Sequence, residues 1–140
     1  MIITDKINVQ LHPVQYNEDD RAQRILNAFP VIPNFQINVS YVESTQHVVA
    51  WHMHGLQTDY WLCIRGAFKV GLAVGSSVQW EYLSDKNLRV LEIKPGVYHG
   101  YRAVVPGSIL LYCLDHKYDP ADEFRAAVGA FKESWDADSK

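Results

Sequence analysis

The stretch His47–Gly75, HVVAWHMHGLQTDYWLCIRGAFKVGLAVG, determines the fold class of this chain. It contains three short runs that are rich in β-branched and aromatic residues: His47–His54, Asp59–Arg65 and Ala67–Val74. Glycines lie between these runs and after the last one. Runs of this length and composition, bounded by turn residues, are typical of β-strands. The stretch therefore predicts three consecutive strands.

The same pattern continues on both sides of this stretch. Further expected strands, each bounded by turn residues, are Lys6–Leu11, Phe35–Val42, Ser77–Tyr82, Leu88–Ile93, Val97–Arg102 and Ser108–Leu114. Several short strands at this spacing predict an all-β sandwich or barrel rather than βαβ units. Residues 17–28 are polar and predict either a short helix or an extended arm.

An α-helix is expected near the C-terminus, over about residues 119–135. Asp119 is a suitable N-cap, and Pro120 occupies the first helical position. Apolar residues then recur at helical spacing and would pack against the barrel: Phe124, Ala127, Val128, Phe131 and Trp135. We therefore expect one domain over residues 1–140, with an N-terminal arm to about residue 34, a barrel over about 35–115 and this helix.

Composition and charge exclude several classes of protein. The net charge of −3 and the absence of a Lys/Arg cluster argue against a surface for nucleic acid or for a membrane. No apolar run approaches the roughly 18 residues of a membrane helix, and the N-terminus lacks the features of a secretory signal. Cys63 and Cys113 both lie in apolar stretches, which predicts reduced core residues of a cytoplasmic protein.

Three histidines and one acid are the first candidates for chemistry. His52 and His54 share one face of their strand, and His99 follows a Pro-Gly turn that begins another strand. The pattern H-x-H-x4-D-x6-G from His52, with Asp59 as its acid, and the pattern G-x-x-H that ends at His99 resemble the two-part cupin signature. The resemblance implies a double-stranded β-helix, or jelly-roll barrel, in which these four residues hold a divalent metal. The alternative is that one or two of the histidines are cavity residues in a site without metal.

Proton transfer is a second hypothesis for the same region. Abstracting a proton next to a carbonyl requires a base on one face of the substrate, and an acid on the other face if the centre is to invert. His54 is a suitable base, and Tyr112, in an apolar strand, is a suitable acid. A tyrosine in such a strand is also commonly a core residue with its hydroxyl on the backbone. The residues alone leave both interpretations open.

An ordered set of segments spans roughly residues 20–120. After Asp20-Arg21 it consists of Gln36–Ser40, Val49–His54, Leu83–Asn87, Ile93–Tyr101, Leu111–Cys113 and Tyr118–Pro120. In this order the set resembles the dTDP-4-dehydrorhamnose 3,5-epimerase family. The patterns of that family are D-x-R-G, followed by Q-x-N-x-S, V-L-R-G-L-H, L-S-x-x-N, I-P-x-G-x-x-H-G-F, L-Y-K and Y-x-P.

The resemblance implies a jelly-roll cupin that dimerises and binds a nucleotide-linked 4-keto-6-deoxy sugar without metal. By position, His54 would be the base and Tyr112 the opposing acid. His99 and Tyr118 would contact the substrate, and Arg21 would contact phosphate, across the dimer. The expected activity is that of an isomerase, either this epimerisation or the related movement of a keto group.

Two further side chains are candidates for substrate binding. Trp51 is suited to stacking on a base or a sugar, although core packing is the commoner role for such a residue. Arg65 can meet phosphate at a pocket rim, or it is a surface residue at a strand end.

The chain departs from the family pattern at its catalytic positions. The lysine of the family falls on Asp59, so an anion replaces a cation, and the aspartate that orients the base has no clear match. These departures suggest two alternatives. One is a metal-dependent cupin in which a cation takes over the role of the lysine. The other is a cupin that binds sugar nucleotides without catalysis.

Overall fold

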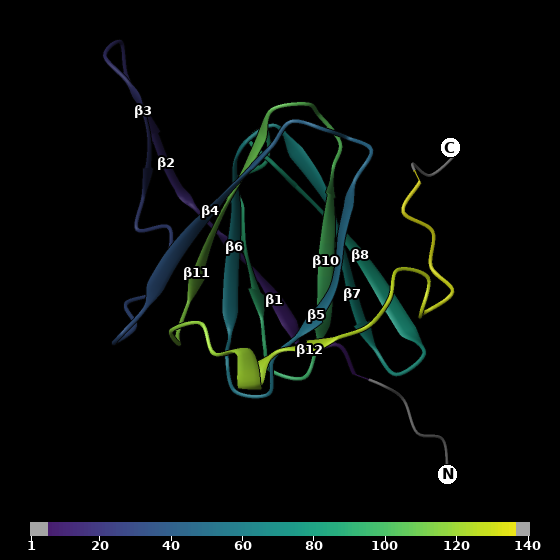
Figure 1. Cartoon of the computed structure of the whole chain (residues 1–140). Helices are drawn as coiled ribbons and strands as arrows, with labels where there is room; N and C mark the ends of the chain where they lie inside the picture. The colour runs from purple at the N-terminus through teal and green to yellow at the C-terminus, as the bar shows by residue number, and fades with distance from the viewer. Residues whose placement is uncertain (1–5, 137–140) are drawn as a thin grey trace.

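The computed structural model describes residues 6–136, and these form two antiparallel five-stranded sheets that face each other (Figure 1). The first sheet has the order β1-β9-β6-β11-β4, with β1 (Val9–Pro13), β9 (Arg89–Ile93), β6 (Asp59–Arg65), β11 (Ser108–Leu114) and β4 (Gln36–Val42). The second has the order β12-β5-β10-β7-β8, with β12 (Phe124–Arg125), β5 (Val48–Met53), β10 (Tyr98–Ala103), β7 (Ala67–Val74) and β8 (Ser77–Ser84). The predicted all-β jelly roll is confirmed.

The chain passes back and forth between the two sheets. From β4 to β12, consecutive strands lie in opposite sheets except for β7 and β8, which form a hairpin. Inward-facing side chains of both sheets therefore meet in one core. Phe68, Leu72, Leu91 and Leu110 are completely buried there. Burial of each such side chain contributes about 1.5–3 kcal/mol to stability.

The segment before β4 covers the outer face of the first sheet. Val14, Ile25 and Phe29 pack there against a buried cluster that includes Leu62 and Cys113. Strands β2 (Gln15–Glu18) and β3 (Gln23–Leu26) pair as a hairpin that projects away from the barrel (Figure 1). Of the two interpretations of residues 17–28, the extended arm is therefore the observed one.

The predicted C-terminal α-helix is wrong. Asp119 and Pro120 do begin a helical turn, in which the Asp119 carboxylate accepts from the Ala121 amide at 2.9 Å, but this 3-10 turn, η1, covers only Pro120–Asp122. The next residues pair as β12 with the edge of β5, so an open sheet edge captures a segment with helical periodicity. The described residues contain no α-helix, and none of their segments is therefore a helix that could span a membrane.

Residues 119–136, which we call the C-terminal strap, run along the outside of the second sheet. Gly129 and Lys132 adopt positive φ values of 90° and 55°, which interrupt the expected helix. The predicted apolar stripe is divided: Phe131 and Trp135 pack on Trp51, whereas residues 124 and 128 are exposed. The strap thus covers the second sheet without forming an α-helix.

Candidate active site

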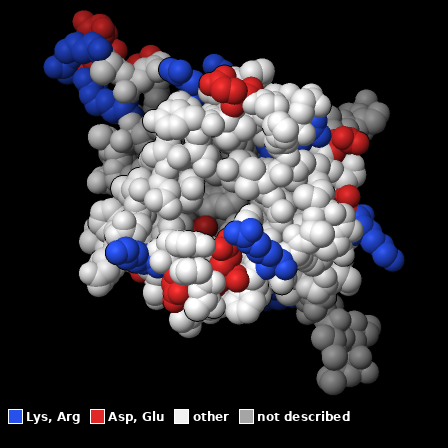
Figure 2. Space-filling model, in the orientation of Figure 1, with Lys and Arg blue, Asp and Glu red and all other residues white. Residues whose placement is uncertain are grey.

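A cavity of about 220 Å³ lies between the two sheets. Figure 2 shows a hollow in the largely uncharged face of the barrel, with acidic and basic side chains on its lower rim. Side chains from both sheets, the connecting loops and the strap line it: Asn38, Val49, His52, His54, Gln57, Asp59, Trp61, His99, Gly100, Tyr101, Leu110, Tyr112, Leu114, Tyr118 and Glu123. This cavity contains most of the residues predicted to act in catalysis.

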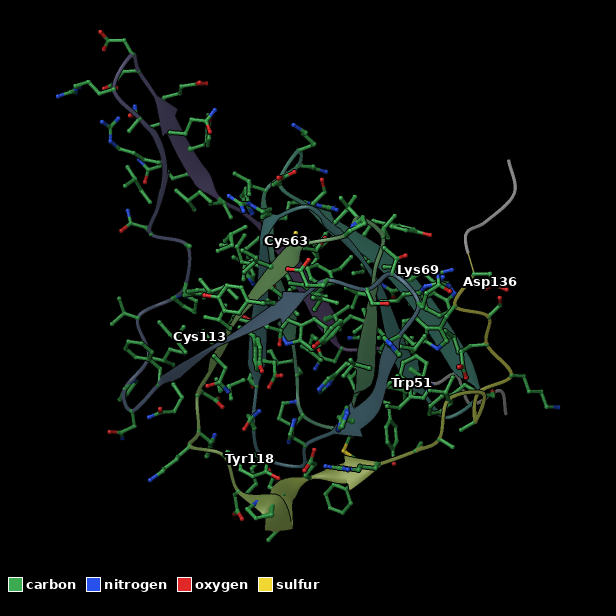
Figure 3. The ribbon with its side chains drawn as sticks, turned by 45° about the horizontal axis from the view of Figure 1, so that its top comes forward. Trp51, Cys63, Lys69, Cys113, Tyr118 and Asp136 are labelled. Atoms are coloured by element: carbon green, nitrogen blue, oxygen red, sulfur yellow. The ribbon has the colours of Figure 1, made fainter. Side chains whose placement is uncertain are left out.

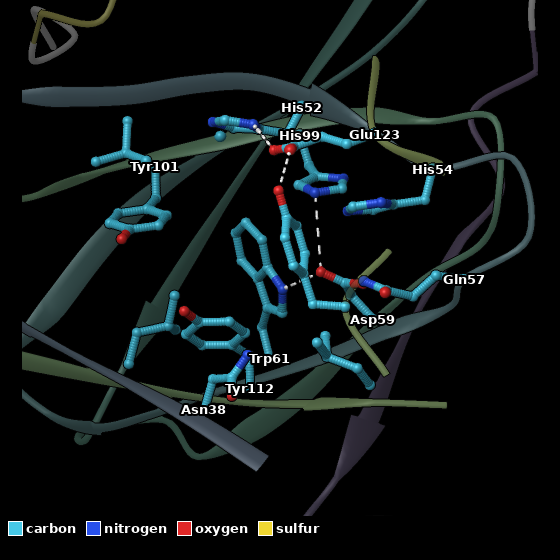
Figure 4. A pocket seen from close by; sticks show the side chains of 15 residues that line it. Asn38, His52, His54, Gln57, Asp59, Trp61, His99, Tyr101, Tyr112 and Glu123 are labelled. Atoms are coloured by element: carbon cyan, nitrogen blue, oxygen red, sulfur yellow. Dashed lines mark hydrogen bonds and ion pairs between the residues drawn. The ribbon is translucent and has the colours of Figure 1, made fainter. Parts of the chain in front are cut away.

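Strand register places the imidazoles and the phenol on opposite walls. His52 of β5 and His99 of β10 are register partners on adjacent strands of the second sheet, and His54 follows directly after β5. Tyr112 of β11 and Asn38 of β4 are register partners in the first sheet. Figure 4 shows the three imidazoles together on one side of the cavity, with Asn38 and Tyr112 on the other.

His54 is held in one tautomer by the strap. Its Nδ1 lies 2.9 Å from the main-chain oxygen of Asp122. Because a carbonyl oxygen only accepts hydrogen bonds, Nδ1 carries the proton and Nε2 keeps its lone pair. His54 also stacks on His99, with ring centroids 5.4 Å apart. This geometry prepares the Nε2 of His54 to accept a proton or to bind a cation.

His99 is a neutral, buried imidazole. Burial lowers its pKa to about 4, although the nearby carboxylate of Asp59 opposes the shift. Its Nδ1 donates to the main-chain oxygen of Val97 at 3.1 Å. Its Nε2 lies 3.8 Å from the Asp59 carboxylate, which is too far for a hydrogen bond.

Asp59 is a buried carboxylate whose oxygens accept from neutral donors. Gln57 Nε2 lies 2.7 Å from one oxygen, and Trp61 Nε1 lies 3.1 Å from the other. One ligand atom from each of His54, Asp59 and His99 lies within 4.8 Å of the other two. These three residues have the chemistry and the spacing to hold a divalent cation.

His52 does not join this three-residue cluster, which differs from the predicted four-ligand metal site. It lines the same wall, but its Nδ1 lies 3.0 Å from a carboxylate oxygen of Glu123. The other Glu123 oxygen accepts from the Tyr118 hydroxyl at 2.9 Å. Burial alone would raise the pKa of Glu123, but hydrogen bonds from Tyr118, His52 and Arg125 outweigh it and lower that pKa. Glu123 is therefore an anion beside His52.

Three predicted binding residues lie outside the cavity. Trp51 points to the outer face of β5, where its ring centroid lies 5.0 Å from that of Phe131 and 5.1 Å from that of Trp135 (Figure 3). It therefore does not stack on a ligand in this cavity. Arg65 is exposed at the end of β6 and does not line the cavity. Arg21 lies at the hairpin turn, paired with Asp19 at 2.7 Å, and does not line the cavity.

Several site residues were not predicted. Asn38 lies within the Gln36–Ser40 match, so a motif pointed to it. Tyr101 is the last residue of the Ile93–Tyr101 match, so a motif pointed to it as well. Gln57 lies at a loop position that carries no special sequence signal. Glu123 lies in the segment that was expected to form a helix, and its position depends on the strap.

The comparisons with known proteins identify the fold. No protein-family model matches the chain, and no curated protein matches it significantly. A dTDP sugar isomerase from Desulfovibrio desulfuricans G20 is similar in structure, with a TM-score of 0.80, 22% identity, and coverage of 96% of this chain and 95% of that one.

Two further structures are similar over most of the chain. The rmlC epimerase of Mycobacterium tuberculosis has a TM-score of 0.78 and 18% identity, over 91% of this chain and 74% of that one. A mutant 3,4-ketoisomerase from Thermoanaerobacterium thermosaccharolyticum, in complex with TDP-4-keto-6-deoxyglucose, has a TM-score of 0.74 and 18% identity, over 89% of this chain and 92% of that one. This chain therefore has the jelly-roll fold that these sugar-nucleotide epimerases and isomerases share.

Proposed function

We propose that this protein is an isomerase that acts on a nucleotide-linked keto sugar by moving a proton next to the carbonyl. The observation that carries the proposal is the placement of His54 and Tyr112 on opposite walls of one cavity. His54 has a lone pair on Nε2, because its Nδ1 donates to the Asp122 carbonyl. Tyr112 is register-paired with Asn38, so a hydroxyl and an amide share the opposite wall.

The chemistry follows from the acidity of a C–H bond beside a carbonyl. His54 accepts the carbon-bound proton, and the electrons move onto the carbonyl oxygen to form an enolate. Hydrogen-bond donors such as the Tyr112 hydroxyl and the Asn38 amide then stabilise the negative oxygen. Return of a proton from Tyr112 inverts the centre, which is epimerisation. Return of a proton from the imidazole wall to the former carbonyl carbon, while the hydroxyl on the deprotonated carbon passes its own proton to the former carbonyl oxygen, moves the keto group, which is ketoisomerisation.

The size of the cavity suits a sugar ring. Its volume of about 220 Å³ lies below the roughly 300–1,000 Å³ of sites that enclose a drug-sized ligand, so a nucleotide would lie outside it. Tyr118 is exposed at the cavity and its hydroxyl is anchored on Glu123. We therefore assign Tyr118 and His99 to substrate binding. On this proposal the reaction requires no cofactor, and the protein acts in the cytoplasm, where its thiols stay reduced.

The experiment is solvent exchange with TDP-4-keto-6-deoxyglucose in D₂O, followed by NMR. Deuterium should enter at a carbon beside the carbonyl, and the product distinguishes an epimer from a moved keto group. His54→Ala and Tyr112→Phe should each lower the exchange rate by about 10²–10⁴-fold, the usual range for a lost general acid or base. Tyr16→Phe, on the hairpin, is the matched control. Binding of the sugar nucleotide without any exchange would instead indicate a non-catalytic protein.

A homodimer is part of this proposal. The outer face of strand β4 exposes an apolar row, and alternation places its three residues on one side: Ile37, Val39 and Tyr41. Phe35, directly before the strand, is exposed as well. Such a row at a sheet edge is suited to a second copy. A dimer through this face would also bring the hairpin with Arg21 near the partner. Analytical ultracentrifugation should give a dimer that Val39→Lys makes monomeric, whereas Val128→Lys on the exposed strap should leave it intact.

A metal-dependent cupin is the second candidate, and a specific cluster favours it. His54, Asp59 and His99 present ligand atoms within 4.8 Å of one another. Both imidazoles donate Nδ1–H to a main-chain carbonyl, which is the usual support of a metal-bound histidine. A cation there would act as a Lewis acid on the carbonyl. Stoichiometric metal after purification without chelator, lost in Asp59→Asn, would support this candidate; trace metal that Asp59→Asn does not change would refute it.

A further inference from the structure

Two adjacent strap residues each hold one histidine of the cavity. The Asp122 carbonyl accepts from His54 Nδ1 at 2.9 Å, and the Glu123 carboxylate lies 3.0 Å from His52 Nδ1. In both rings the second nitrogen, Nε2, is left for the cavity, which both side chains line. Both strap residues lie about 70 positions after the histidines that they contact, so a distant segment of the chain imposes this orientation.

Asp122 also fixes the loop that follows His54. Its carboxylate accepts from the backbone amides of Gly55 at 2.9 Å, Leu56 at 3.1 Å and Gln57 at 3.3 Å. The carbonyl of Asp122 thus accepts a hydrogen bond from His54, and its carboxylate accepts hydrogen bonds from the next three residues. Removing this carboxylate would release three backbone amides and shift the carbonyl that orients His54.

The rest of the strap is fastened to the second sheet by buried groups. Phe131 and Trp135 pack on Trp51, while Lys69 Nζ lies 2.6 Å from the Asp136 carbonyl oxygen (Figure 3). Arg102 Nη1 donates to the Trp135 carbonyl at 2.8 Å. Lys69 is almost completely buried, and a buried ammonium requires such partners. These contacts bind the strap at the end distant from the cavity.

We propose that the strap is a positioning device, in which Asp122 orients His54 and Glu123 orients His52. The inference rests on the proposed proton transfer, because that chemistry requires the tautomer of His54 that the strap selects. The physical basis is that the partner of one ring nitrogen decides which nitrogen of an imidazole is free to react. Asp122 and Glu123 are therefore positioning residues rather than catalytic ones.

The first test reads the tautomers directly, without substrate. Long-range ¹H–¹⁵N correlation spectra of the labelled full chain should show the Nδ1–H tautomer for both His52 and His54. Glu123→Ala should change the ring signals of His52 and leave those of His54 unaltered. Asp122→Ala should do the reverse. Glu133→Gln is the matched control, because this strap carboxylate bonds only to groups of the strap itself, and it should leave both rings unchanged.

The second test is kinetic and uses the same variants. Asp122→Ala should lower kcat by about 10–100-fold, a part of the 10²–10⁴-fold that general acid–base catalysis supplies, and should change KM little. Glu123→Ala also releases the Tyr118 hydroxyl, so it should raise KM as well as lower kcat. Glu123→Gln, which keeps an acceptor oxygen, should recover part of the lost kcat. An Nε2–H tautomer in the unaltered protein, or equal effects of all three strap variants on both rings, would overturn the inference. Correct tautomers in a protein that catalyses no solvent exchange would refute the proposed function alone.

Discussion

Protonation of His99 is the event that we expect to weaken this fold in mild acid. The imidazole is almost completely buried, and burial lowers its pKa to about 4 from an ordinary value of 6.5. The unfolded chain therefore takes up a proton near pH 6.5, whereas the native state stays neutral until about pH 4. Because the unfolded state binds more protons in this window, the free energy of unfolding falls as the pH falls through it.

The size of the effect follows from the two pKa values. A difference of one pKa unit between the folded and unfolded states corresponds to about 1.36 kcal/mol. The lowering of the His99 pKa from 6.5 to about 4 therefore contributes about 3 kcal/mol of stability, which is present at pH 7 and lost near pH 4. This is a large share of the roughly 5–15 kcal/mol by which a domain of this size is stable. The neighbouring carboxylate of Asp59 favours the protonated ring and opposes the shift, but burial is the larger cause.

The assay is urea unfolding at several pH values between 4 and 7.5, in buffer that contains EDTA. His99→Asn replaces the ring with an amide that can still donate to the Val97 carbonyl and that does not titrate. The variant is expected to be less stable at pH 7, because a buried ring is lost, but to lose about 3 kcal/mol less than the parent protein on acidification. His47→Asn, at an exposed position, is the control for removal of a histidine. If parent and His99→Asn lose stability in parallel, the assignment of this acid sensitivity to His99 is refuted.

Two further predictions concern the packing around the site. A Cβ atom at Gly71 would lie 2.6–2.9 Å from three tryptophan rings where the strap packs on the second sheet, so Gly71→Ala should destabilise the fold by about 1–3 kcal/mol and lower Tm in calorimetry. Burial raises the pKa of the Cys63 thiol to about 11 and also raises that of Cys113, so neither should react with a thiol reagent at pH 8 until the protein unfolds. Reaction of either thiol in the native state at the rate of free cysteine would contradict this second prediction.

The strands were predictable where local signals define both of their ends. Asp59–Arg65, Ala67–Val74 and Ser108–Leu114 have the same bounds in the sequence prediction and in the structure. Gly66 and Gly75, which end the first two, adopt φ values of 79° and 60° that favour glycine. A turn whose backbone requires a particular residue can be recognised without knowledge of the rest of the fold.

The C-terminal helix was not predictable in this way, because its competitor is distant in sequence. Asp119 and Pro120 do begin a helical turn, so the local signal is genuine. The residues that follow instead complete the hydrogen bonding of β5, some 70 positions earlier, with Ala126 and Trp51 exchanging two backbone hydrogen bonds of 3.1 Å. Helix propensity contributes only a few tenths of a kcal/mol per residue, so this strand pairing outweighs it.

The candidate site shows the same division between local and distant information. His52, His99 and Tyr112 reach the cavity by strand alternation, which the sequence displays. The group that orients the base was expected to be an aspartate side chain, and no position matched it. In the structure, the main-chain carbonyl of Asp122 is the group that orients His54. Every residue has a main-chain carbonyl oxygen, so the sequence does not indicate which one binds His54. That depends on the path of the strap in the folded structure.

The two candidate functions compete for one atom, which makes them separable. In the first function, the lone pair on His54 Nε2 accepts the substrate proton. In the second, the same lone pair binds a cation that Asp59 and His99 also hold. A metal-bound Nε2 has no lone pair for proton transfer. A protein that holds metal here must therefore use another base, and His52 beside the Glu123 carboxylate is the available imidazole. Loss of exchange in His54→Ala of a metal-free protein thus supports only the first function, whereas exchange that depends on both bound metal and His52 supports only the second.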